Sequence, residues 1–253
     1  MRVFAVSDLH IDYEVNGRWI AALSALDYRD DILVLAGDVS DTRKLLGWCL
    51  AELAKRFRRV LFVPGNHDLW VLREGRGQDS LQKLEDVRTT VIAAGASMEP
   101  VLEGGVEIVP LLSWYDYSFG EPSGELRSVW MDYHACRWPA GTMEKDVAAK
   151  FASLNEKHPR RGGDTVITFS HFLPRVDLMP VFIPGRGRLL YPVLGVAGLD
   201  EQVRERGARI HVYGHSHVRR QVTIDGVSYV NNAFGYPGEW WVSSKTLKCI
   251  HEC

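Results

Sequence analysis

The sequence has few cysteines and no large excess of one charge. Four cysteines occur in 253 residues, at Cys49, Cys136, Cys249 and Cys253. Their small number and uneven spacing suit reduced thiols in a cytoplasmic compartment better than a disulfide framework. The formal net charge is −2, so charge gives no general reason to expect a nucleic acid or an anionic membrane as a partner.

Long apolar runs are also absent. No stretch approaches the roughly 20 residues that a membrane-spanning helix needs, and no basic leader precedes an apolar segment at the start. Hydrophobic residues make up 46% and charged residues 25% of the chain, as in ordinary globular proteins. We expect a cytoplasmic protein, folded as one domain over residues 1–253, that does not associate with a membrane. The sequence leaves its oligomeric state open.

Short apolar runs that alternate with helical patterns indicate an α/β fold. Six runs are interpreted as buried strands: Arg2–Val6, Asp31–Ala36, Val60–Val63, Val106–Leu112, Thr165–Phe169 and Arg209–Tyr213. Helical patterns cover Arg18–Leu26, Asp41–Phe57, Ser80–Ala93, Met143–Lys157 and Leu199–Arg206. After Gly214 the pattern changes to short strands, and Asp225-Gly226 predicts a hairpin turn. We therefore expect a layered α/β sandwich.

Five of these strands run directly into side chains that bind metal ions. These side chains are Asp8 and His10, Asp38, Asn66 with His67 and Asp68, His171, and His215 with His217. Sites in α/β sheets form at the carboxyl ends of strands, so the five ends can converge on one place. So many polar groups at the edge of a core require cations. Imidazole with carboxylate suits zinc, manganese or iron, and with one bridging carboxylate seven ligands divide evenly between two ions.

The ordered blocks Asp8-x-His10, Gly37-Asp38, Gly65-Asn66-His67-Asp68, His171 and Gly214-His215-x-His217 resemble the signature of the calcineurin-like metallophosphoesterases. All five blocks are present, in order, between residues 8 and 217. The resemblance implies a four-layer α/β/β/α sandwich with a dinuclear metal site at the C-terminal ends of strands. It assigns one metal to Asp8, His10 and His217, and the second to Asn66, His171 and His215, with Asp38 as the bridge.

The same resemblance implies a hydrolase that cleaves a phosphate mono- or diester. A hydroxide that bridges two divalent or trivalent ions (manganese, iron or zinc) would attack phosphorus. His67 would face the scissile phosphate and, as an imidazolium, assist the leaving group. Asp68 would hydrogen-bond the other ring nitrogen of His67 and fix its tautomer.

Two segments, residues 113–139 and 172–195, are expected to wall the pocket, because long loops without obvious secondary structure are often functional. The first contains Trp114 and Tyr115 among other aromatic residues, and the second carries Arg175, Arg186 and Arg188. Aromatic rings suit a base or another flat group, and arginine suits phosphate oxygens. In the alternative interpretation, the aromatic residues pack as a satellite core under the loop and the arginines are ordinary surface residues.

The leading hypothesis is thus a phosphoesterase with a small or nucleotide-like phosphorylated substrate. A protein serine/threonine phosphatase is the second hypothesis, but the chain lacks large appended segments that could recruit protein partners. No basic stripe interleaved with aromatic residues supports a nuclease. A third hypothesis, a binding module that kept the fold and lost the chemistry, is disfavoured because every expected ligand is present. His211 lies inside a predicted strand and is interpreted as a packed or surface side chain.

Overall fold

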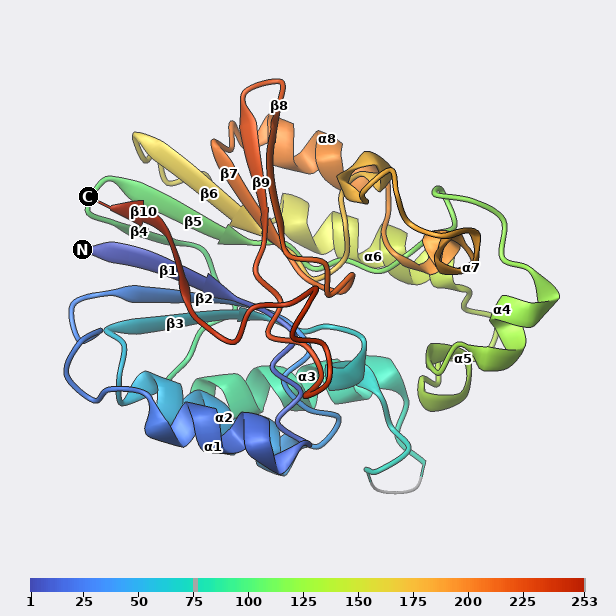
Figure 1. The fold of residues 1–253 in the computed structure, drawn as a ribbon, viewed down its shortest axis with the longest axis horizontal. Helices are drawn as coiled ribbons and strands as arrows, with labels where there is room; N and C mark the ends of the chain where they lie inside the picture. The colour runs from blue at the N-terminus through green and yellow to red at the C-terminus, as the bar shows by residue number, and fades with distance from the viewer. Residues whose placement is uncertain (75–76, 253) are drawn as a thin grey trace.

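The computed structural model describes residues 1–74 and 77–252, and of Arg186 it describes the backbone alone. In these residues two β-sheets face each other, and helices cover the outer face of each sheet (Figure 1). The predicted four-layer α/β/β/α sandwich is confirmed. No helix in the described part of the chain is long and apolar enough to cross a membrane.

The first sheet has the strand order β10-β1-β2-β3. Its strands are β10 (Lys248–Glu252), β1 (Arg2–Val6), β2 (Ile32–Ala36) and β3 (Arg59–Val63), with β10 antiparallel to β1 and the others parallel. Helices α1 (Glu14–Ala22), α2 (Arg43–Ala54) and α3 (Ser80–Ala93) lie on its outer face, in the lower half of Figure 1. Side chains alternate across a strand, so Leu33 and Leu35 pack against the helices while Val34 faces the second sheet.

The second sheet has the order β4-β5-β6-β7-β9-β8. Its strands are β4 (Val101–Glu103), β5 (Val106–Pro110), β6 (Thr165–Phe169), β7 (Ile210–Tyr213), β9 (Val227–Asn231) and β8 (Arg220–Ile224). The four central strands are parallel, and both edge strands are antiparallel to their neighbours. Helices α6 (Glu144–Glu156) and α8 (Gly198–Glu205) cover its outer face. The predicted turn at Asp225-Gly226 joins β8 to β9, with φ of 47° and 84°, as a type I′ hairpin requires.

The two segments expected to be pocket loops contain short helices. Residues 113–139 include α4 (Gly124–Val129) and α5 (Asp132–Ala135), and residues 172–195 include η2 (Val176–Leu178), α7 (Gly185–Arg188) and η3 (Tyr191–Val193). One further turn, η1 (His67–Leu69), follows β3. The expectation of long stretches without secondary structure is therefore corrected.

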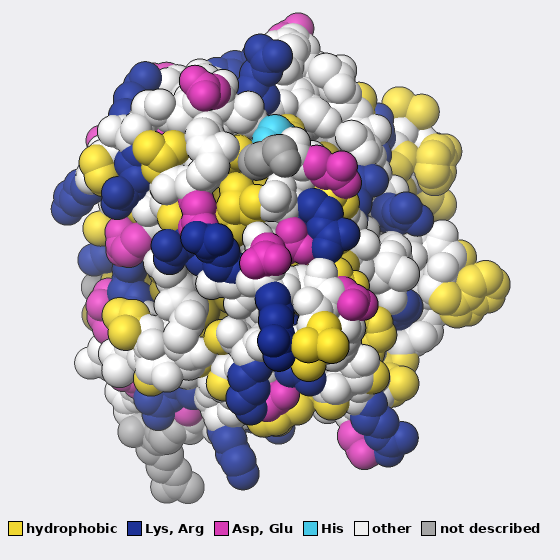
Figure 2. Space-filling view, turned by 90° about the vertical axis from the view of Figure 1, so that its left-hand side faces the viewer, with side chains coloured by type: hydrophobic (Ala, Val, Ile, Leu, Met, Phe, Trp, Pro, Cys, Tyr) yellow, Lys and Arg dark blue, Asp and Glu magenta, His cyan; other side chains and the backbone are white. Residues whose placement is uncertain are grey.

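The parallel strands of both sheets end on the same side, away from the two termini at the left of Figure 1. Figure 2 shows the opposite face, where lysine and arginine side chains are intermixed with aspartate and glutamate. The cysteines Cys49, Cys136 and Cys249 are free thiols, and Cys253 lies outside the described residues. The carboxyl ends of the strands are where the predicted ligands lie.

Candidate metal centre and active site

Five of the predicted ligands lie in a strained backbone conformation. Asp8, His10, Asp38, His215 and His217 have φ of 55°, 41°, 56°, 66° and 53°. A residue other than glycine in this region costs on the order of 1 kcal/mol or more and persists only where the surroundings enforce it. The strand ends are therefore built to turn these side chains towards one place.

Two glycines of the motifs allow the ligands to approach the backbone. A Cβ atom at Gly65 would lie 2.1 Å from Oδ1 of Asp38, and one at Gly37 would lie 2.5 Å from Nδ1 of His171. Both distances are far below van der Waals contact. Glycine is required at both positions because a ligand side chain crosses directly over the backbone.

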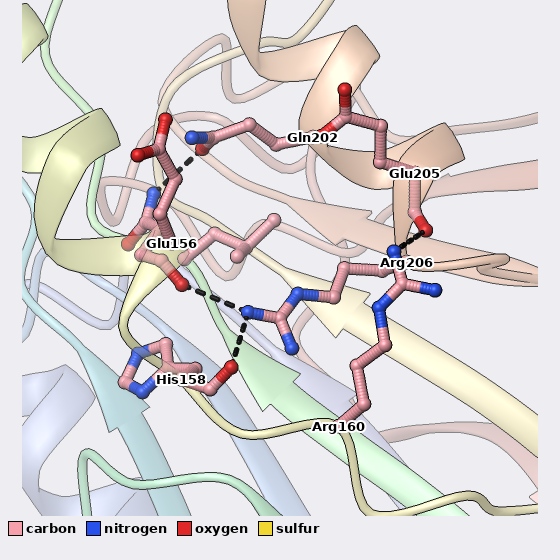
Figure 3. Close-up of a pocket in the computed structure, with 8 residues that line it drawn as sticks. Glu156, His158, Arg160, Gln202, Glu205 and Arg206 are labelled. Atoms are coloured by element: carbon pink, nitrogen blue, oxygen red, sulfur yellow. Dashed lines mark hydrogen bonds between the residues drawn. The ribbon is translucent and has the colours of Figure 1, made fainter.

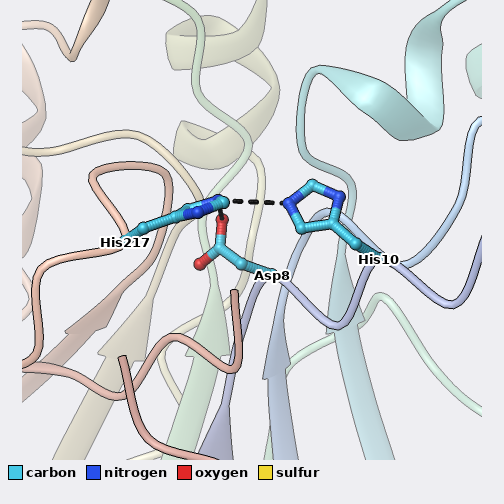
Figure 4. Close-up of side chains that lie close together, drawn as sticks. All are labelled: Asp8, His10 and His217. Carbon is cyan, nitrogen blue, oxygen red and sulfur yellow. Dashed lines mark hydrogen bonds and ion pairs between the residues drawn. The ribbon is translucent and has the colours of Figure 1, made fainter. Parts of the chain in front are cut away.

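One group of predicted ligands consists of Asp8, His10 and His217, whose side chains point towards one another (Figure 4). Nε2 of His217 lies 3.1 Å from Nε2 of His10 and 3.3 Å from Oδ1 of Asp8. Two ligand atoms bound about 2.0–2.1 Å from a tetrahedral ion lie roughly 3.3 Å apart. The spacing therefore fits one cation among these three side chains.

A second group surrounds His171. Its Nε2 lies 3.1 Å from Oδ1 of Asn66, 3.1 Å from Nδ1 of His215 and 3.4 Å from Oδ2 of Asp38. The same Oδ2 of Asp38 is 3.9 Å from Nε2 of His10, in the first group. The structure thus brings all seven predicted ligands together, with Asp38 between two groups that could each hold an ion.

The pKa values of these ligands show how the charges balance without cations. Burial disfavours ionised Asp8, but His217 and His171 together outweigh burial and lower the pKa of Asp8 to about 2. Burial alone would lower the pKa of His171, yet Asp38 raises it to about 9. Likewise Asp8 and Glu239 overcome burial and raise the pKa of His217 to about 10. A metal ion bound by these imidazoles would have to displace the protons that the carboxylates favour on them.

His67 borders these groups and faces a cavity. Its side chain is 17% exposed, and its Nε2 is 3.9 Å from Oδ2 of Asp38. The ring stacks on Trp70, with centroids 3.7 Å apart and an angle of 28°. The cavity beside it has a volume of about 310 Å³ and is lined by His10, Asp12, Tyr13, Asp41, His67, Trp70 and Tyr236. This imidazole is therefore placed to meet a molecule in the cavity.

Asp68 does not have the partner that the sequence suggested. Its buried carboxylate accepts hydrogen bonds from the backbone N–H groups of Asp38, Val39, Ser40 and Gly65, at 2.8, 3.1, 3.2 and 2.8 Å. Among the described residues it forms no hydrogen bond with the ring of His67. The correction has a simple cause, because η1 turns this carboxylate towards the orphaned N–H groups that follow β2. Asp68 holds together the two turns that carry Asp38 and Asn66.

Comparison with known proteins identifies the family. A family model described as calcineurin-like phosphoesterase matches residues 1–219. The chain belongs to this family. The phosphoesterase is 28% identical to the [acyl-carrier-protein] phosphodiesterase PptH of Mycobacterium tuberculosis, over 94% of this chain and 79% of that protein. It also shares its fold with the crystal structure of phosphopantetheinyl hydrolase (PptH) from M. tuberculosis, with a TM-score of 0.79, 23% identity and coverage of 94% and 91% of the two chains.

Membership of this family makes the protein a hydrolase of phosphate esters, in a family that depends on metal ions. The hypothesis of a binding module without chemistry is thereby set aside. Nothing in the comparisons supports a serine/threonine phosphatase in particular.

The aromatic residues predicted to contact substrate lie in the core of the phosphoesterase. Trp114 and Tyr115 are 0% and 1% exposed. Both rings pack against Phe172, with centroids 5.1 and 5.7 Å away. The alternative interpretation as a packed cluster holds for these two residues, because an enclosed side chain cannot reach a substrate.

Arg175 and Arg188 bond to groups of their own segment, and Arg175 also bonds to Asp200 of α8. Arg175 forms salt bridges with Asp177 at 2.7 Å and with Asp200 at 3.1 Å, so its donors are already engaged. Arg188 donates to a backbone carbonyl of the same segment at 3.4 Å. The side chain of Arg186 lies outside the described part of the chain. The expected phosphate contact is therefore corrected for Arg175.

Sequence reasoning missed three residues that support the site. Glu239 accepts a hydrogen bond from Nδ1 of His217 at 2.6 Å, and such carboxylate partners orient metal-binding imidazoles. The Tyr236 ring lies 4.4 Å from that of His10. Asp132 accepts a hydrogen bond from the side chain of Asn66. Tyr236 and Glu239 follow β9. Had residues 227–231 been recognised as a further parallel strand, the residues after its carboxyl end would have been candidates for the site.

The segment after β9 is fastened over the ligands. The ammonium group of Lys245 donates to the carbonyls of Phe234, Gly235 and Tyr236. The amide of Asn16 donates to the Gly235 carbonyl at 3.1 Å. These bonds fix three consecutive carbonyls and so hold the Tyr236 ring in place. The hydroxyl of Tyr236 then lies 3.4 Å from Nε2 of His67.

A separate cavity of about 230 Å³ lies between the C-terminal ends of α6 and α8 (Figure 3). Arg206 donates to the carbonyls of Asn155 and His158, and Arg160 donates to the carbonyl of Glu205. These guanidinium groups satisfy carbonyls at the ends of the two helices. The cavity is lined by residues at the ends of α6 and α8, by His158 and Arg160, and by Leu111, which directly follows β5. The hydrogen bonds on its wall connect the ends of the two helices and are structural.

Proposed function

We propose that this phosphoesterase is a phosphodiesterase with a dinuclear metal centre. One ion is held by Asp8, His10 and His217, the other by Asn66, His171 and His215, and Asp38 is shared. The carrying observation is the position of Asp38 between two ligand groups of suitable spacing, beside the cavity that His67 faces. Histidine with carboxylate favours manganese, iron or zinc over magnesium.

Cations held by these residues would supply positive charge for phosphate oxygens and would lower the pKa of a bound water molecule. His67 performs the proton transfer on the opposite side of phosphorus. Its ring is held between the Trp70 face and the Tyr236 hydroxyl. A water oxygen forms a bond to phosphorus while the bond from phosphorus to the leaving oxygen breaks, and protonated His67 gives its proton to that leaving oxygen. A positioned acid of this kind contributes about 10²–10⁴-fold to the rate.

We further propose that the substrate is a diester of phosphopantetheine on an acyl carrier protein. The activity named for the M. tuberculosis relative supports this choice. The cavity supports a diester over a monoester, because Asp12 and Asp41 lie on its wall. Arg73 bridges both carboxylates at 3.1 and 2.8 Å, so two carboxylates share one guanidinium group on this wall. A diester carries one negative charge near this wall, whereas a monoester carries up to two and is repelled more strongly.

The test uses protein stripped of metal with a chelator, with manganese, iron or zinc restored singly. The wild type, Asp38→Asn and the control Asp116→Asn are each assayed with three substrates: holo-acyl carrier protein, bis(p-nitrophenyl) phosphate and p-nitrophenyl phosphate. We expect metal to restore diester hydrolysis in the wild type and in Asp116→Asn, and Asp38→Asn to remain inactive.

The outcomes separate the parts of the proposal. Cleavage of the synthetic diester without cleavage of the carrier protein would reject the substrate and keep the phosphodiesterase. A preference for the monoester would reject the diester assignment. Wild-type protein that binds fewer than two ions per chain would reject the dinuclear centre.

A further inference from the structure

Asp132, at the start of α5, is a buried carboxylate on which three side chains converge. Asp132 is 2% exposed. Its Oδ1 accepts from Nδ2 of Asn66 at 2.8 Å and from Nε1 of Trp70 at 2.7 Å, and its Oδ2 accepts from Nε1 of Trp130 at 2.8 Å. All three donors are neutral. Among the residues that the structure describes, no cation forms an ion pair with Asp132. A buried carboxylate without such a partner is costly, which indicates a task beyond packing.

The first contact determines which end of the Asn66 amide faces the metal site. An amide has a donor end and an acceptor end, whereas a carboxylate only accepts. Nδ2 of Asn66 must therefore face Asp132, and Oδ1 faces the opposite way, 3.1 Å from Nε2 of His171. In the reversed orientation an N–H₂ group would face the cation. Asp132 thus selects the orientation in which Asn66 can act as a ligand.

The other two contacts extend to His67 and His215. Trp70, held by Asp132, is the ring on which His67 stacks. Trp130 lies edge-on to His215, with centroids 5.8 Å apart and an angle of 87°. One carboxylate therefore bonds one predicted ligand, Asn66, directly and holds the rings that contact a second ligand, His215, and the proposed acid, His67.

We propose that Asp132 is a positioning residue that orients Asn66 for the second metal ion and, through Trp70, orients His67. This inference rests on the proposed dinuclear function. It also assigns the segment of residues 113–139 a role, which is to support the second metal group from behind. The residues that line the cavity beside His67 come from elsewhere in the chain.

The test compares Asp132→Ala with the control Asp116→Ala, from the same segment. The Asp116 side chain accepts a hydrogen bond from the backbone N–H of Ser118, in an exposed turn. Metal affinity is measured by chelator competition on full-length protein. Loss of an outer partner of a ligand typically weakens metal binding 10–100-fold. We expect one of the two ions to bind 10–100-fold more weakly to Asp132→Ala, and both ions to bind normally to Asp116→Ala.

A second readout does not need metal or activity. In chelator-treated protein, the side-chain amide signal of Asn66 and the indole N–H signal of Trp70 are followed by NMR hydrogen exchange. Both should exchange faster in Asp132→Ala than in the wild type. Should this variant not fold, Asp132→Asn keeps the volume with one acceptor oxygen and should show smaller losses in the same direction.

Wild-type metal affinities together with unchanged exchange in a folded variant would overturn the positioning role. A lower melting temperature with normal metal affinity would overturn it too, since that result marks a purely structural residue. Faster exchange in a protein whose wild type binds fewer than two ions would reject the dinuclear function and leave the contact of Asp132 with Asn66 established.

Discussion

Replacing His211 tests whether a neutral imidazole is buried in the second sheet. Ser170 donates its hydroxyl proton to the carbonyl of Phe172 at 2.8 Å, so its oxygen accepts from Nε2 of His211 at 3.1 Å. Nδ1 then accepts from the hydroxyl of Thr168 at 2.8 Å. This network uses the neutral tautomer. Burial lowers the pKa of His211 from 6.5 to about 3.

The direction in which pH changes the stability follows from the protons that His211 binds in the folded and the unfolded state. Below its ordinary pKa of 6.5, His211 takes up a proton in the unfolded chain, whereas in the folded chain it stays neutral down to about 3. The unfolded state binds more protons, so acidification favours unfolding. The stability that the neutral His211 contributes is fully present well above pH 6.5 and is lost as the pH falls below that value. Between about pH 7.5 and about pH 5 the loss is about 2 kcal/mol.

The assay is urea unfolding of chelator-treated protein at several pH values, for the wild type, His211→Asn and His134→Asn. His134 is an exposed histidine and serves as the matched control. We expect His211→Asn to be less stable at neutral pH, because it loses packing. Its free energy of unfolding should fall by about 2 kcal/mol less than that of the wild type between the two pH values. Parallel pH profiles for wild type and His211→Asn would refute a neutral buried His211.

Three further substitutions test other contacts. Gly65→Ala should abolish stable metal binding and lower activity by about 10²-fold or more, because its Cβ would displace Asp38; metal content and kcat measure this. Glu239→Gln should weaken metal retention about 10–100-fold, because Nδ1 of His217 loses a charged acceptor; chelator competition measures this. Arg175→Ala should leave KM unchanged and cost about 0.2–1 kcal/mol of stability, because its partners are Asp177 and Asp200.

The outcomes that would contradict these predictions are specific. Gly124 has open space around its Cα, so Gly124→Ala should match the wild type, and normal metal content in Gly65→Ala would show that the backbone yields. Unchanged metal retention in Glu239→Gln would mean that this carboxylate does not orient His217. A clear rise of KM in Arg175→Ala would restore the substrate role that its salt bridges argue against.

The sequence by itself determined the strands and the ligands that follow them. An apolar run such as Ile32–Ala36 is a local pattern, and the polar residue after it must lie at a strand end. Parallel strands bring their carboxyl ends to one edge. Asp8, Asp38 and His171 could therefore be placed together without knowledge of their contacts. The pairing of β10 with β1, which joins the two ends of the chain, had no such local signal.

The partners of the supporting side chains were decided by tertiary structure alone. Asp68 could bond either the adjacent ring of His67 or backbone groups 30 residues away, and the fold chose the latter. An aromatic residue such as Trp114 is equally expected in a pocket wall and in a hydrophobic core, and only the packing in the folded protein distinguishes these two locations. Asp132 meets Asn66 across 66 residues. Strand formation depends on neighbours in the sequence, whereas a hydrogen-bond partner depends on which distant atoms the folded layers bring within about 3 Å.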